Sequence, residues 1–163
     1  MVPQGLLHKG LLGTLTIAPY PCISNLYLGK GGVLRYDSLM AGLQNNTPVP
    51  EELRLRSGGK MLALNYPDLG EIPLTAEFLR VYSPSAEVRG HGQGNEVLQV
   101  GKEDVSITGI EPVGNYAVKL IFSDGHDSGL YSWDILHEFA KSHTQLWQSY
   151  LQRLEQAGHQ RKV

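Results

Sequence analysis

Residues 113–133 read VGNYAVKLIFSDGHDSGLYSW, and this stretch decides the fold. Every second side chain of residues 116–122 is apolar, which is typical of a strand that buries one face. The polar segment 123–129 predicts a tight turn, and residues 130–131 begin a second short strand. Ser132 is a suitable N-cap for a following helix, and Asp134 lies in its first turn. The order is therefore strand, turn, strand and helix.

The segment upstream predicts a β-hairpin and a short helix. Residues 53–66 read LRLRSGGKMLALNY, in which two alternating runs flank the paired glycines of a tight turn. Residues 67–70 predict another turn, and residues 75–82 a short helix. Thr75 supplies the N-cap of that helix, and Pro84 ends it because its ring disfavours helical geometry at the preceding residue.

The remaining segments complete an α+β pattern. Residues 87–95 (EVRGHGQGN) predict a loop, and residues 97–100 and 105–110 predict strands. Apolar residues at spacings of three and four predict a long amphipathic helix from Ser132 to a stop at Gly158. Its distal part, residues 146–154, either folds back on its own domain or provides a self-association surface. Because strands and helices do not alternate, we expect an α+β fold with a mostly antiparallel sheet.

Composition limits the classes of function. The chain has 163 residues, enough for one domain, with 18% charged residues and a net charge of −2. This charge gives no basic surface for nucleic acid or anionic membranes, and no apolar run is long enough to cross a bilayer. Cys22 is the sole cysteine, which excludes an internal disulfide and a multi-cysteine metal site. We expect a cytoplasmic protein.

The first 47 residues differ from the rest. Four charged residues fall in this segment, and glycine and proline interrupt its short apolar runs repeatedly. We expect residues 1–47 to be a poorly ordered leader, absent from the natural chain if translation starts near residue 48. The alternatives are an ordered extra strand or a partner-binding arm. Secretion is disfavoured because the apolar run at residues 11–18 is interrupted.

Four blocks of sequence resemble one family. They are residues 53–66, residues 72–88 (IPLTAEFLRVYSPSAEV), residues 109–133 and the helix that follows. Together they resemble the gamma-butyrobetaine-hydroxylase-like N-terminal domain. Members of that family occur as short stand-alone bacterial proteins, as leading modules of iron- and 2-oxoglutarate-dependent oxygenases, and attached to iron–sulfur carriers. The resemblance places this domain at residues 48–142, followed by a helical extension and tail at residues 143–163.

The resemblance also implies a metal site and its loss. In the oxygenases this module holds a structural zinc through Cys-Pro-Cys-x-x-Cys, just after a Leu-Arg, and a histidine in a later turn. Here Ser83, Ser85 and Val88 stand at the cysteine positions, and His126 remains at the fourth. Zinc prefers thiolate and imidazole ligands, so we expect this site to bind no metal. Packing or hydrogen bonds from Ser83 and Ser85 would then hold the loop beside His126.

Other candidate sites have simpler structural explanations. His126 with Asp124 or Asp127 could hold a weak metal or form an acid–base pair, but the same residues also make a turn whose histidine bonds to a neighbouring loop. His91 lies in a glycine-rich loop with no following helix, unlike a phosphate cradle. Cys22 has no partner base that the sequence identifies.

We therefore expect no catalytic residues and no cofactor. The sequence favours a small non-catalytic module that binds a protein partner, linked by family resemblance to iron or iron–sulfur handling. The alternatives are a metal-binding protein that uses His126, and an accessory part of a 2-oxoglutarate-dependent oxygenase system. We expect a monomer or weak homodimer that binds neither nucleic acid nor membranes.

Overall fold

Two antiparallel sheets and three helices form the α+β fold of the computed structural model, which describes residues 8–9, 14–16, 47–89 and 96–162. The first sheet has the order β1 (His8–Lys9), β2 (Thr14–Thr16), β3 (Glu52–Arg56), β4 (Met61–Tyr66) and β5 (Gly70–Thr75). The second contains β6 (Ile107–Val113), β7 (Ala117–Phe122) and β8 (Leu130–Ser132). The helices are α1 (Ala76–Val81), α2 (Ala86–Arg89) and α3 (Trp133–Gln156).

The predicted hairpin is confirmed as β3 and β4, which pair from Glu52↔Asn65 to Arg56↔Met61. Its turn is a single 3₁₀ turn, Ser57–Gly59, in which Gly59 has a φ of 85°. A Cβ at Gly59 would lie 2.2 Å from the Ile107 carbonyl oxygen of β6. Glycine is needed here both for its backbone conformation and because the two sheets approach closely.

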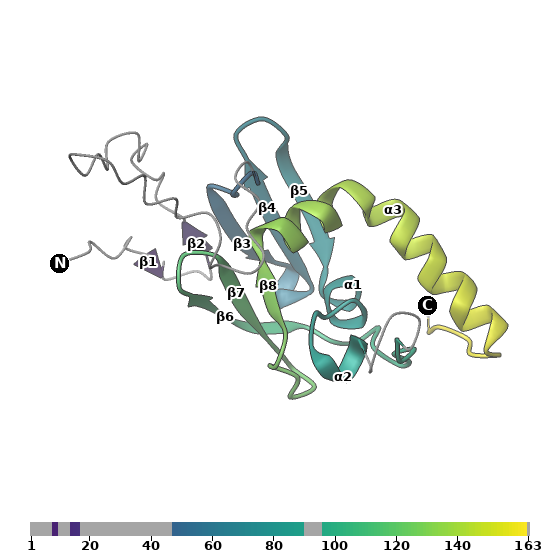
Figure 1. The fold of residues 1–163 in the computed structure, drawn as a ribbon. Helices are drawn as coiled ribbons and strands as arrows, with labels where there is room; N and C mark the ends of the chain where they lie inside the picture. Colours follow the sequence, from purple (N-terminus) through teal and green to yellow (C-terminus); the bar gives the residue numbers. More distant parts are fainter. Residues whose placement is uncertain (1–7, 10–13, 17–46, 90–95, 163) are drawn as a thin grey trace, which may run out of the picture.

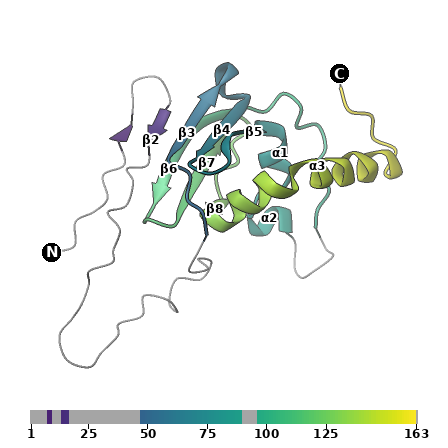
Figure 2. The same ribbon diagram turned by 90° about the horizontal axis from the view of Figure 1, so that it is seen from above.

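The core lies between the sheets and α3. Leucines of β3 and β4, the apolar face of β7, and Phe78 of α1 join one buried cluster with Trp133 and Leu136 at the start of α3. Figure 1 shows α3 beginning at the end of β8 and running across β5 toward α1, beyond the end of the sheets. Figure 2 shows the same helix lying along one side of the molecule, next to α1 and α2. α3 therefore covers the core and also extends past it.

The distal part of α3 packs on its own domain. Tyr150 and Leu154 are buried in a second small cluster with Val81 at the end of α1. The Tyr150 hydroxyl donates to the Gln99 carbonyl at 3.0 Å, and the Tyr82 hydroxyl donates to the Leu146 carbonyl at 2.6 Å. Folding back on the domain, one of the two alternatives for residues 146–154, is the arrangement that the structure shows.

Several element predictions need correction. Residues 97–100 form no strand; Val97 is 52% exposed, and the segment instead supports α3. The sequence pattern missed β5, whose Pro73 is tolerated because β5 is an edge strand. It also missed α2, because the sequence pattern predicts a loop from residue 87 and no element at residue 86. Ser132 occupies the N-cap position of α3, but its hydroxyl makes no capping hydrogen bond.

Most of the predicted leader, residues 1–47, lies outside the described residues. Within it the structure describes β1 and β2, which pair antiparallel with each other and, through β2, with β3. For these five residues the arrangement corresponds to the alternative of extra ordered strands. Cys22 and His91 also lie outside the described residues.

Candidate functional site

The structure brings together the positions where the resemblance implies zinc ligands. Thr75 Oγ1 accepts from the Phe78 backbone N–H and starts α1, which ends just before Ser83-Pro84. The chain then turns through Ser85 into α2, and the Ser85 Oγ accepts from the Val88 backbone N–H at 3.4 Å. From the other sheet, the turn between β7 and β8 carries His126 to this loop. Ser83 Oγ lies 2.8 Å from His126 Nε2.

Hydrogen bonds hold His126 on both sides. Its Nδ1 lies 3.2 Å from Glu87 Oε2. Burial lowers the pKa of His126, as does the charge of Arg80, against the opposing effect of Glu87. The imidazole is therefore neutral at pH 7, so one ring nitrogen donates and the other accepts. Because a carboxylate accepts, Nδ1 donates to Glu87 and Nε2 accepts from the Ser83 hydroxyl.

A network of charged residues supports the same turn. Arg80 Nε of α1 lies 2.9 Å from Asp124 Oδ2, and Lys102 Nζ lies 2.8 Å from the same oxygen. The Asp124 Oδ1 also accepts from the His126 backbone N–H at 3.3 Å. Partial burial raises the pKa of Asp124, but the bonds from Lys102, His126 and Arg80 together lower it to about 2. Asp124 therefore links the β7–β8 turn to Arg80 of α1.

The hydrogen-bond order Ser83, His126, Glu87 matches that of a serine–histidine–acid triad. Unlike the accessible nucleophile of such a triad, the Ser83 hydroxyl is buried. Ser83 is 1% exposed, and a Cβ placed on Gly129 would lie 2.3 Å from its Oγ. An acyl substrate therefore has no space beside the hydroxyl, and the Glu87 side chain, rather than the serine, faces solvent at 70% exposure. The arrangement joins the loop to the turn.

The donors in this cluster do not fit a structural zinc. Two hydroxyls, one valine and an imidazole whose Nε2 already contacts Ser83 offer none of the thiolates that such a site uses. Within the described ranges, no three histidine, cysteine, aspartate or glutamate side chains lie close enough to share a metal ion. Asp124 makes ion pairs with Arg80 and Lys102, and Asp127 is exposed. That the site holds no metal stays a prediction.

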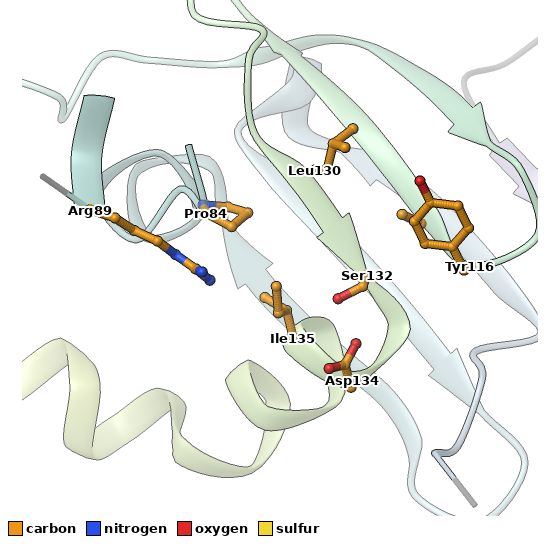
Figure 3. A pocket seen from close by; sticks show the side chains of 8 residues that line it. Pro84, Arg89, Tyr116, Leu130, Ser132, Asp134 and Ile135 are labelled. Carbon is orange, nitrogen blue, oxygen red and sulfur yellow. The ribbon is translucent and has the colours of Figure 1, made fainter. Parts of the chain in front are cut away.

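A hollow beside this cluster is a second candidate site, which sequence reasoning missed. It measures about 500 Å³ and lies over β8, between the loop before α2 and the start of α3 (Figure 3). Its lining is Pro84, Arg89, Tyr116, Ala117, Leu130, Ser132, Asp134 and Ile135. The signal that could have identified it is the alternation at residues 130–132, which places Leu130 and Ser132 opposite Tyr131.

The hollow combines apolar and charged groups. Leu130 is 43% exposed on the edge strand β8, and Figure 3 shows Arg89 extending from α2 toward Ile135. Arg89 makes no ion pair with any other residue in the described part of the chain. One carboxylate oxygen of Asp134, Oδ1, is buried there and has no hydrogen-bond partner among the described residues. An unpaired buried acceptor is costly.

Comparison with protein families identifies the domain. The family described as "Gamma-butyrobetaine hydroxylase-like, N-terminal" matches residues 53–137. These residues include α1, α2 and the turn between β7 and β8, which carry the hydrogen-bonded cluster. The chain belongs to this family. The match confirms the resemblance drawn from the sequence blocks. Comparison with curated proteins found no match.

The chain is also similar to proteins of solved structure. One protein studied in solution by NMR is 50% identical, with 72% of this chain and 92% of that chain covered and a TM-score of 0.63. A second NMR structure is 48% identical, with 73% and 89% covered and a TM-score of 0.62. A crystallised protein of unknown function from Acidithiobacillus ferrooxidans, of the DUF971 family, is 35% identical, with 56% and 91% covered and a TM-score of 0.46.

Proposed function

We propose that this protein is a small, non-catalytic accessory module that binds another protein through the hollow over β8. The observation that carries the proposal is the contrast between the two candidate sites. The Ser83–His126 cluster is closed, whereas the hollow exposes Leu130 beside Arg89, which makes no ion pair within the described residues. A protein surface supplies both apolar contact and matching polar groups.

The chemistry of the hollow specifies what the partner presents. An apolar side chain covers Leu130 and Ile135, and an acidic group pairs with Arg89. Arg89 then acquires an ion pair that the described residues do not give it.

The absence of catalysis and the cellular setting are parts of the same proposal. The buried hydroxyl of Ser83 supports the first, because it has no access to substrate. Among the described helices, none has the length and hydrophobicity that spanning a membrane requires. A single cysteine supports a reducing, cytoplasmic setting. The link to iron or iron–sulfur handling rests on family resemblance alone.

Site-specific photo-crosslinking tests the proposal. A benzophenone side chain replaces Leu130 in one variant and Leu69 in a matched control, since Leu69 is similarly exposed at 51% but lies in the turn before β5. In the protein's own cells, we expect a defined crosslinked protein from position 130 and none from position 69. The Arg89→Glu change should abolish that crosslink by reversing the charge beside the hollow.

Three outcomes would refute the assignment. Equal crosslinking from positions 130 and 69 would show non-specific contact. A crosslink that survives Arg89→Glu unchanged would show that the hollow's charge plays no part in recognition. Turnover of a small molecule by the purified protein, lost on Ser83→Ala, would replace the accessory role with catalysis.

A further inference from the structure

α1 carries two buried charged residues, Arg80 and Glu77, and Glu77 lies in a separate site from the Ser83–His126 cluster. Glu77 is 5% exposed, although carboxylates are rarely buried without a partner. In the described part of the chain its ion-pair partner is Arg161, from the segment that follows α3. Arg161 Nε donates to Oε1 at 2.8 Å and Nη2 donates to Oε2 at 2.6 Å. This is the two-bond geometry that a carboxylate makes with guanidinium alone.

Aromatic side chains complete the site. The Arg161 guanidinium carbon lies 5.5 Å from the centroid of the Trp147 ring, within the range of a cation–π contact. The ring of Tyr150 packs beside that of Trp147, with 5.2 Å between their centroids. A carboxylate at the base and an indole at the wall make a receptor for a planar cation. The site is therefore built for arginine rather than lysine.

The segment that brings Arg161 is weakly attached. The chain leaves α3 at Gly158, which has a φ of 73°, and turns back along the helix toward α1 (Figure 1). The Arg161 side chain is 37% exposed, and among the described residues Lys162 is held by a hydrogen bond from its backbone N–H to Glu103 Oε1 at 3.1 Å. The site can be vacated by moving the few residues that follow α3, without disturbing a described helix or strand.

We propose that the Glu77–Trp147 site binds an arginine side chain of a partner protein, and that Arg161 occupies it as an internal competitor until the partner arrives. Charge complementarity selects the ligand, because Glu77 needs a cation once Arg161 leaves. Glu103 beside the site favours a partner segment that is basic around its arginine. The inference uses no residue of the hollow and does not depend on the proposed function.

The test empties the site in the full-length chain with Arg161→Ala. Two tryptophans give two indole N–H signals by NMR, and Trp133, whose Nε1 donates to the Asn115 carbonyl, serves as the internal reference. The probe is the blocked tripeptide acetyl-Gly-Arg-Gly-amide. We expect a saturable shift of the Trp147 signal in Arg161→Ala, at least tenfold weaker binding to the unmutated protein, and at least tenfold weaker binding of the Gly-Lys-Gly analogue.

Controls separate this proposal from simpler explanations. Adding Glu77→Gln to Arg161→Ala should abolish the shift, and a folded Arg161→Ala protein that shows no saturable shift would overturn the proposal. If Arg161→Ala fails to fold, Arg161→Lys keeps a charge but not the paired bonds, and should admit the arginine peptide at severalfold lower concentration than the unmutated chain; failure to do so also overturns it. A dimer that Arg161→Ala converts to monomer would instead assign the site to a second copy.

Discussion

Glu77 and Arg80 are both almost fully buried on the short helix α1, yet their partners come from different kinds of structure. Arg80 pairs with Asp124, which lies in the turn between two strands and also binds Lys102. Glu77 pairs with Arg161, which lies five residues after the end of α3. A buried charge held by a strand turn is structural, whereas one held by a tail is exchangeable.

The largest effect should come from breaking the Arg80 pair. Asp124→Ala leaves Arg80, 5% exposed, with Gln99 as its remaining side-chain hydrogen-bond partner among the described residues, and it also releases Lys102. An uncompensated buried charge is strongly destabilising, so the free energy of unfolding should fall by about 3 kcal/mol. Urea denaturation measures it. Asp124→Asn keeps an acceptor and should cost about 1 kcal/mol; equal losses would show that charge is irrelevant here.

Two glycines, Gly129 in the closed cluster and Gly158 after α3, should differ in their tolerance of a side chain. A Cβ at Gly129 would meet Ser83 Oγ at 2.3 Å, so Gly129→Ala should cost about 2 kcal/mol by overpacking the closed cluster. A Cβ at Gly158 would meet nothing within 4 Å, and Gly158→Ala should cost about 1 kcal/mol through its positive φ alone. Thermal unfolding of the two variants tests this order. A larger loss from Gly158→Ala would mean that the tail, not the cluster, is the more constrained region.

Arg161→Ala should lower the free energy of unfolding less than Asp124→Ala. Arg161 is partly exposed, and its departure lets water reach Glu77, so the free energy of unfolding should fall by only about 1 kcal/mol. Amide hydrogen exchange should quicken in residues 157–162 and stay unchanged in residues 123–129. Faster exchange across the β7–β8 turn would show that this turn and the segment after α3 are coupled, which would contradict their independence.

The sequence was sufficient where local chemistry governs the fold. Alternation predicted β3, β4 and β7, and Thr75 with Pro84 predicted α1 to within a residue at each end. The prediction of a strand at residues 97–100 was wrong, because this segment pairs with no strand in the described part of the chain. Val97 is exposed, and the Gln99 carbonyl accepts a hydrogen bond from Tyr150 of α3. Contact with α3, rather than local β-propensity, determines the conformation of this segment.

The candidate sites were predictable only in part. The family pattern indicated that Ser83 and His126 meet, and the structure places their side chains in hydrogen-bond contact. Glu87, which holds the other nitrogen of the imidazole, was treated as the start of a loop. The pairing of Glu77 with Arg161 spans 84 residues, and no local pattern encodes such a contact. Long-range ion pairs depend on how α3 folds back, which periodicity does not specify.

The smallest effect should be the pH dependence of the closed cluster. Burial lowers the pKa of His126 below its value in the unfolded chain, about 6.5, so the unfolded state takes up more protons as the pH falls below that value. Stability should therefore be fully present above the unfolded-state value of about 6.5 and decline as the pH falls below it, while Asp124, with a pKa of about 2, stays ionised. Urea midpoints at several pH values measure the decline. His126→Gln should reduce the slope without removing it, because burial also lowers the pKa of His143 in α3; an unchanged slope would show that His126 is not the group that titrates.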